Sequence, residues 1–171
     1  MGIEVEDIKT PQPPFDDCIL EYHFHVYFRQ NNRVNTEQAI ALREKILRLS
    51  ATSSPKVYAI PYHVNYKPIG PHLVGSYEVW VPYESFADFY QWIILNRGNL
   101  SILIHPLTRL EVKDHTERAT WLGEEFPLDV SVLSELLPQV PAQYPELKLG
   151  YSKYMHTDQQ NKILLKLLER E

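Results

Sequence analysis

Residues 19–28, with the sequence ILEYHFHVYF, determine how this chain can fold. Most of these residues are aromatic or β-branched, and they alternate with a period of two, as in a half-buried strand. One face of such a strand is apolar and consists of Leu20, Tyr22, Phe24, Val26 and Phe28. The opposite face consists of Glu21, His23, His25 and Tyr27. We therefore predict a strand with one side toward a hydrophobic core and the other side available for chemistry.

A helix and a second strand are predicted after this segment. Asn35 is expected to be the N-cap of a helix that ends near Ser50, with Gln38 three residues after the cap. Its apolar residues recur at helical spacing and are Ala39, Leu42, Ile46 and Leu49. Residues 57–63 (VYAIPYH) predict a strand that lies at an edge or is bulged at Pro61, because proline cannot donate to a ladder.

The same succession of strand, helix and strand is then repeated. Residues 77–81 (YEVWV) predict a third strand, and a helix follows with Phe86, Phe89, Tyr90 and Ile93 at helical spacing. Gly98 is expected to end that helix in the left-handed conformation. Residues 100–105 (LSILIH) predict a fourth strand, which Pro106 ends.

The order βαββαβ is that of the ferredoxin-like split βαβ, an α+β fold with an antiparallel sheet. The first and third strands are then central, both helices cover one face, and the other face is left open. If the fourth strand runs antiparallel to the first with Leu100 near Phe28, His105 lies opposite His23.

We expect three regions in the chain: an N-terminal tail at 1–18, the ferredoxin-like domain at 19–133, and a C-terminal extension at 134–171 that ends in an amphipathic helix. The length of 171 residues fits one compact domain. A net charge of −5 without a long basic run argues against nucleic-acid binding. There is no membrane-spanning apolar stretch and no secretion signal, so we expect no membrane association and a cytoplasmic location.

The cysteine and histidine content limits the kinds of metal site. The single cysteine, Cys18, excludes an internal disulfide and a thiolate-rich metal site, so any metal must be held by nitrogen and oxygen. His23 and His25 project from one face of the strand about 7 Å apart at their Cα atoms, close enough to bind one ion. His105 is expected on the same face.

Two further histidines lie near this predicted patch. His72 follows a Gly-Pro pair in the loop before the third strand, and His115 follows the fourth strand in an Asp-His-Thr motif. With Glu21 and Glu78 beside them, these histidines could form a facial nitrogen and oxygen site of the kind that holds non-haem iron(II). Zinc fits the same ligands, and the histidines could equally form hydrogen bonds within the sheet.

Four motifs carry a resemblance to a known family: YHFHVYF, GPHLVGSYEVWVP, NRGNLSILIHPLT and DHTERATWLGEEFPLDVSVL. Together they resemble the DOPA 4,5-dioxygenase family of fungi and bacteria. The resemblance implies cleavage of a catechol such as DOPA next to one hydroxyl (extradiol cleavage) by non-haem iron(II) and dioxygen. His23 and His25 match the His-x-His of the family, and His72, His105 and His115 match its Gly-Pro-His, His-Pro and Asp-His motifs. Arg109 stands where such sequences often have glycine.

The expected function is therefore that of an extradiol dioxygenase with iron(II) as cofactor. We expect His23, His25 and His105 to bind the metal, and His72 and His115 to act as catalytic residues in proton transfer and substrate orientation. Two alternatives remain open: a non-catalytic ferredoxin-like module for ligand binding or assembly, and a zinc-dependent hydrolase on the same histidines. We also expect a homodimer, because an open sheet face must be covered.

Overall fold

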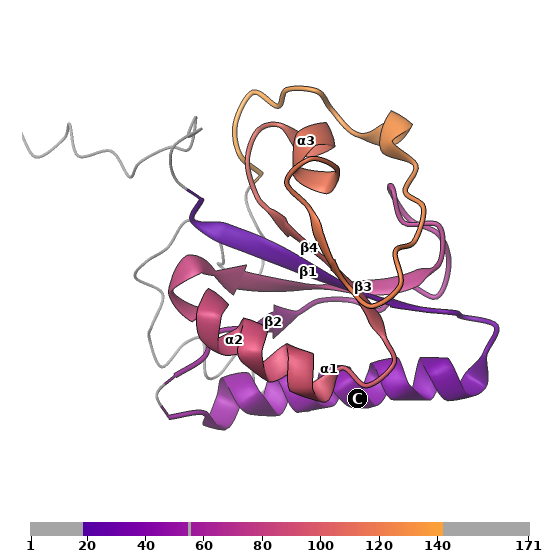
Figure 1. Cartoon of the computed structure of the whole chain (residues 1–171), viewed down its shortest axis with the longest axis vertical. Coiled ribbons are helices and arrows are strands. Elements are labelled where there is room, and N and C mark those ends of the chain that lie inside the picture. The colour runs from indigo at the N-terminus through magenta and orange to yellow at the C-terminus, as the bar shows by residue number, and fades with distance from the viewer. Residues whose placement is uncertain (1–18, 55, 142–171) are drawn as a thin grey trace, which may run out of the picture.

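The computed structural model describes residues 19–54 and 56–141, in which one antiparallel sheet carries helices on one face and a long irregular segment on the other (Figure 1). Its elements in chain order are β1 (Glu21–Phe28), α1 (Arg33–Thr52), β2 (Ile60–Pro61), β3 (Gly75–Pro82), α2 (Tyr83–Asn96), β4 (Ser101–Pro106), α3 (Glu111–His115), β5 (Thr120–Leu122) and the 3-10 turn η2 (Val130–Val132). The predicted N-terminal tail with Cys18 and the predicted terminal helix lie outside the described residues.

The sheet has the strand order β2-β3-β1-β4-β5, and each neighbouring pair is antiparallel. The prediction of an α+β fold with the βαββαβ order is thus confirmed, with β1 and β3 in the interior of the sheet. The predicted register is also confirmed, since His23 lies opposite His105.

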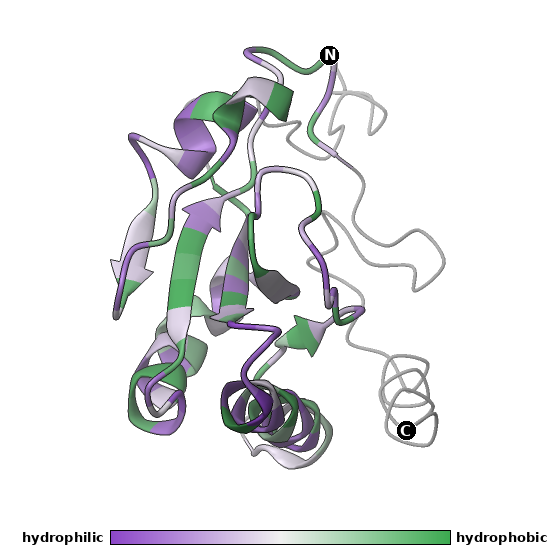
Figure 2. Cartoon of the chain, turned by 90° about the vertical axis from the view of Figure 1, so that its right-hand side faces the viewer, coloured by the Kyte–Doolittle hydropathy of each residue, from purple (hydrophilic) through white to green (hydrophobic). Residues whose placement is uncertain are grey.

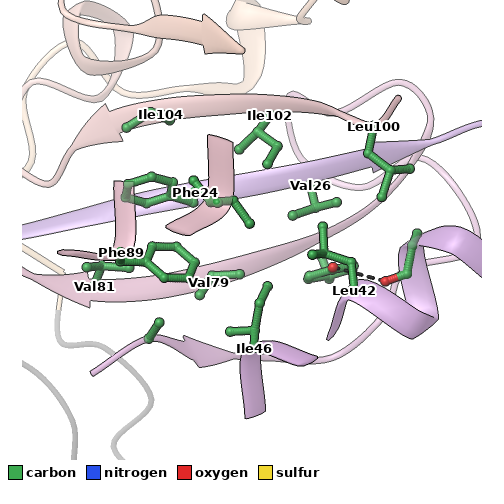
Figure 3. Close-up of a cluster of buried hydrophobic side chains, with 14 of the residues drawn as sticks. Phe24, Val26, Leu42, Ile46, Val79, Val81, Phe89, Leu100, Ile102 and Ile104 are labelled. Carbon is green, nitrogen blue, oxygen red and sulfur yellow. Dashed lines mark hydrogen bonds between the residues drawn. The ribbon is translucent and has the colours of Figure 1, made fainter. Parts of the chain in front are cut away.

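The hydrophobic core lies between the sheet and the two long helices, α1 and α2. Figure 2 shows both helices end-on beneath the strands, each with hydrophobic and hydrophilic parts of its surface. Phe24 and Val26 project from β1 into this core (Figure 3). They meet Leu42 and Ile46 of α1 and Phe89 of α2. The alternation in β1 therefore places its histidines on the face away from these helices.

Two local predictions differ from the structure. Asn32, not Asn35, is the N-cap of α1: its backbone is extended, and its side chain accepts a hydrogen bond from the backbone N–H of Asn35. The Asn35 side chain instead accepts a hydrogen bond from the backbone N–H of Arg29. The second strand contains only Ile60 and Pro61 and lies at the edge of the sheet, as a proline in that segment requires.

Residues 107–141 cross the face that the sequence pattern leaves open. They add α3 and a fifth strand, β5, which pairs with β4 and was not predicted because its three residues are too few to show a period. The backbone N–H of Asp129 donates to the Pro71 carbonyl, which ties this segment to the loop before β3. The chain itself therefore covers part of the histidine-bearing face.

Among residues 19–54 and 56–141, no helix combines the length and the apolar character that a bilayer crossing requires.

Candidate metal centre

The fold brings all five motif histidines into one cluster, although they come from four different segments. His23 and His25 project from β1, and His105 projects from β4 beside them. His72 comes from the loop before β3, and His115 is the last residue of α3. Strands supply the first three side chains and thus hold them on a rigid backbone, whereas a loop and a short helix supply the other two.

The imidazole rings are in close contact. The Nε2 atoms of His25 and His105 lie 3.0 Å apart. The ring centroids of His25 and His72 are separated by 4.2 Å, and those of His105 and His115 by 4.0 Å. His23 lies edge-on to both His25 and His105, with centroid distances of 5.4 Å and 5.3 Å. We call these five side chains the histidine cluster.

Two overlapping triads in the cluster have the geometry of a metal site. The triads are His23, His25 and His105, and His25, His72 and His115; within each, the available ligand atoms lie within 4.8 Å of one another. Imidazole nitrogens bind first-row metals at about 2.1 Å, so two of them at right angles about one ion lie about 3 Å apart. The spacing between His25 and His105 fits this requirement, so these residues suit a metal bound by nitrogen.

Hydrogen bonds at the periphery of the cluster fix the orientation of two rings. The Nδ1–H of His105 donates to the Pro106 carbonyl at 2.7 Å, and the Nδ1–H of His115 donates to the Glu111 carbonyl at 2.9 Å. A carbonyl can only accept, so Nδ1 carries the proton and Nε2 keeps its lone pair. Such outer contacts are typical of metal-binding histidines.

The side chain of Tyr27 contacts the imidazole of His72. Its hydroxyl lies 2.6 Å from His72 Nδ1, and its ring packs against Trp121 and stacks on Phe126. Burial raises the pKa of Tyr27 well above its ordinary value, so the phenol stays protonated at neutral pH. Its hydroxyl can therefore donate to His72 or accept from it.

A carboxylate borders the cluster on the β3 side, as the sequence predicted for Glu78. Its Oε1 lies 3.3 Å from His23 Nε2. Glu21, the other predicted flanking acid, is buried at the start of β1 on the same face. His63 is exposed and is not part of the cluster, and His156 lies outside the described residues.

Burial and neighbouring imidazoles lower the pKa values of four of the clustered histidines, His25, His72, His105 and His115. The pKa of His72 is lowered from 6.5 to about 4, first by burial and then by His115 and His23. Burial also lowers the pKa values of His25, His105 and His115, and neighbouring imidazoles lower them further. A metal ion requires neutral imidazole ligands, so the cluster is prepared to bind one at neutral pH.

A buried network that the sequence did not reveal holds the connection between β4 and α3. The Asp114 carboxylate accepts hydrogen bonds from the backbone N–H and the hydroxyl of Thr108, both at 2.8 Å, and from Arg118 at 3.1 Å. Because Asp114 directly precedes His115, this network fixes the position of that histidine. The Asp-His motif was the only sequence signal for it, since the partners lie several residues away on either side.

A cavity of about 280 Å³ opens over the cluster. His23, His25, His105 and His115 form part of its wall, together with Glu111 and Asp114. The histidine cluster thus borders a space that a small molecule can enter. We call it the cluster cavity.

Comparison with known proteins agrees with this geometry. Residues 22–132 match the family model described as Dopa 4,5-dioxygenase family. A DOPA 4,5-dioxygenase of Amanita muscaria is 48% identical over 146 residues, which are 85% of this chain and 63% of that protein. This chain thus spans less than two thirds of that relative.

Two further proteins are similar to this chain. An uncharacterised 21.2 kDa protein of Botryotinia fuckeliana is 36% identical over 82% of this chain and 79% of its own length. The crystal structure of a candidate dioxygenase from Nostoc punctiforme matches with a TM-score of 0.58 at 32% identity, over 67% of this chain and 91% of that one. The family match includes all five clustered histidines, and this chain belongs to the Dopa 4,5-dioxygenase family.

Proposed function

We propose that this protein is an iron(II)-dependent extradiol dioxygenase that opens the ring of a catechol such as DOPA. The observation that supports this most strongly is the convergence of five largely buried histidines beside a cavity. Membership of the Dopa 4,5-dioxygenase family supports the same reaction class.

We assign His23, His25 and His105 as the iron ligands. Their side chains are almost fully buried, and two adjacent strands hold them, which favours a fixed coordination geometry. Glu78, in contact with His23, orients that ring from outside the triad. The second triad shares only His25 with the first, so variants of His23 and His72 distinguish the two arrangements.

Iron(II) at this triad would supply open coordination positions that bring the two catechol oxygens and dioxygen together. His72 and His115 are assigned to proton transfer and substrate orientation. Both are neutral at pH 7 and can accept a phenol proton, and His115 is less buried than the triad. Tyr27 holds His72 in place through the contact at Nδ1.

The test starts from the full chain stripped of metal and reconstituted with iron(II) without air. DOPA and then air are added, while dioxygen uptake and a yellow product are followed. We expect uptake and colour with iron, and neither with a zinc-loaded sample. The His25→Ala variant serves as the matched control, because His25 belongs to both triads.

Two outcomes favour the alternative functions. Failure to bind a stoichiometric transition metal would favour a module for ligand binding or assembly. Activity of the zinc-loaded sample without dioxygen would favour a hydrolase. Either outcome would reject the dioxygenase.

A further inference from the structure

Part of the wall of the cluster cavity is formed by a segment that has neither helix nor strand structure. This segment is residues 133–141, and its two end residues, Leu133 and Pro141, line the cavity. We call it the wall segment. Most of its residues are exposed, although Val140 is buried. Because no ladder or helix of its own supports it, its position depends on contacts with the rest of the chain.

Arg109 binds the middle of the wall segment at two points. Its backbone carbonyl accepts a hydrogen bond from the backbone N–H of Leu137 at 2.7 Å, and its Nε–H donates to the Leu137 carbonyl at 2.6 Å. A hydrogen bond from a charged donor is roughly twice as strong as one between neutral groups. Leu137 lies between the two residues that line the cavity, so these bonds hold the part of the segment that joins them.

Further hydrogen bonds to the wall segment come from α3, beside which it runs (Figure 1). The Glu111 carboxylate accepts from the backbone N–H of Ser134 at 2.9 Å, and the Val112 N–H donates to the Ser134 carbonyl at 3.4 Å. The Glu111 carbonyl also accepts from the ring of His115. Of the two side chains that hold the segment, Glu111 thus also orients a cluster histidine, whereas Arg109 can be replaced without removing that contact.

We propose that Arg109 is a positioning residue that holds the wall segment through Leu137 and thereby limits the size of the molecules that fit beside the histidine cluster. The cluster cavity has a volume of about 280 Å³, slightly below the usual range of ligand pockets, about 300–1,000 Å³. Displacement of Leu133 and Pro141 would widen it. The limit on size rests on the proposed function, because it takes the cluster as the place where a catechol binds.

Two substitutions of equal length isolate the side-chain hydrogen bond. Arg109→Gln retains an N–H donor that is as many bonds from the backbone as Nε, whereas Arg109→Met has a side chain of the same length without a donor. The backbone hydrogen bond to Leu137 remains in both. Arg97→Met is the matched control: Arg97 also donates to a backbone carbonyl, that of Leu100 at 2.7 Å, and it lies at the end of α2 and does not line the cluster cavity.

Amide hydrogen exchange in the full chain tests whether Arg109 holds the wall segment. The amides of Ser134 and Leu137 are protected while they donate to Glu111 and Arg109. Loss of one charged hydrogen bond should speed their exchange about 10- to 100-fold in Arg109→Met. Arg109→Gln keeps a neutral bond and should exchange about 2- to 10-fold more slowly than Arg109→Met. Arg97→Met should match the unchanged chain, and the amides of β1 and β4 should keep their protection in every variant.

Two catechols test whether the wall segment limits size. Catechol itself has no ring substituent, and 4-tert-butylcatechol has a bulky one. The Kd of each is measured with the iron-loaded full chain without air. Arg109→Met should shift the ratio of the two Kd values toward the bulky catechol by at least about 10-fold, the effect that one methylene group has in a closed pocket. Arg109→Gln should shift it less, and Arg97→Met should leave it unchanged. In air, kcat for catechol should not change, because the cluster is intact.

The results separate this inference from the proposed function. Exchange at Ser134 and Leu137 that is equal in Arg109→Met and the unchanged chain would overturn the role of Arg109. Faster exchange in β1 and β4 as well would show general destabilisation and would also overturn it. An unchanged ratio of Kd values, or no binding of either catechol, would overturn the limit on size. The expected exchange and binding without any turnover in air would support the inference and contradict the dioxygenase.

Discussion

Replacement of Tyr27 by phenylalanine tests whether the contact between the Tyr27 hydroxyl and His72 matters for function. The change removes one hydroxyl, which lies 2.6 Å from His72 Nδ1, and leaves the aromatic packing in place. Both residues are buried, so water cannot easily replace the lost partner. An unsatisfied buried polar group costs about 1–3 kcal/mol, and we expect the free energy of unfolding to fall by that amount.

Tyr77→Phe is the matched control. Tyr77 is also buried, and its hydroxyl donates to the Ala39 carbonyl at 3.0 Å. It projects into the core on the helix-covered face and is not part of the histidine cluster. This control variant should lose a similar amount of stability in urea unfolding.

The two variants should differ in function. Loss of a group that orients an active-site histidine typically costs about 10- to 100-fold in activity or metal affinity. Because we assign His72 to proton transfer, Tyr27→Phe should keep its iron and lose turnover by about that factor, whereas Tyr77→Phe should keep both. Equal turnover in the two variants would show that His72 does not need Tyr27, and would refute the reasoning.

Four further predictions concern the metal, pH, packing and assembly. His25→Ala should abolish iron binding measured by elemental analysis, because His25 belongs to both triads, whereas the exposed His63→Ala should retain it; full iron in the first variant would contradict the site. In the metal-free protein, the pKa of His72 is lowered from 6.5 to about 4. As the pH falls, His72 is therefore protonated in the unfolded chain before it is protonated in the folded one. The free energy of unfolding should fall by up to about 3 kcal/mol between pH 6.5 and pH 4. A free energy of unfolding that stays constant over this pH range in denaturant titrations would disprove this prediction. Gly75→Ala should destabilise the fold by about 1–3 kcal/mol, since its Cβ would lie 2.5 Å from a ring carbon of Phe28, and an unchanged melting temperature would exclude this clash. We propose a homodimer, so light scattering should give twice the chain mass of 20.1 kDa, and the mass of a single chain would reject it.

The sequence predicts the sheet and its histidine-bearing face well, because both follow from a period of two. The alternation in residues 19–28 places His23 and His25 away from the core, and antiparallel pairing places His105 beside them. These inferences need only backbone geometry, which few side chains can change.

Other features depend on contacts that no local pattern encodes. His72 and His115 lie on a loop and a short helix, so their position in the cluster followed from the motifs and not from a period. The contact between Tyr27 and His72 joins residues 45 positions apart, and it became visible only in the folded chain. Similarly, the sequence pattern predicted Asn35 as the N-cap of α1, whereas the extended backbone conformation at Asn32 makes Asn32 the cap.

The most direct test of the proposed function follows the oxygen atoms. The iron-loaded full chain is given DOPA in dioxygen labelled with the heavy oxygen isotope, and the product is analysed by mass spectrometry. Ring opening next to one hydroxyl places one oxygen in a new carboxylate and one in an aldehyde, whose oxygen exchanges with water. We predict labelled oxygen in the carboxylate of the product. A coloured product without label would arise from oxidation of DOPA without oxygen insertion, and would contradict the assignment of this protein as a dioxygenase.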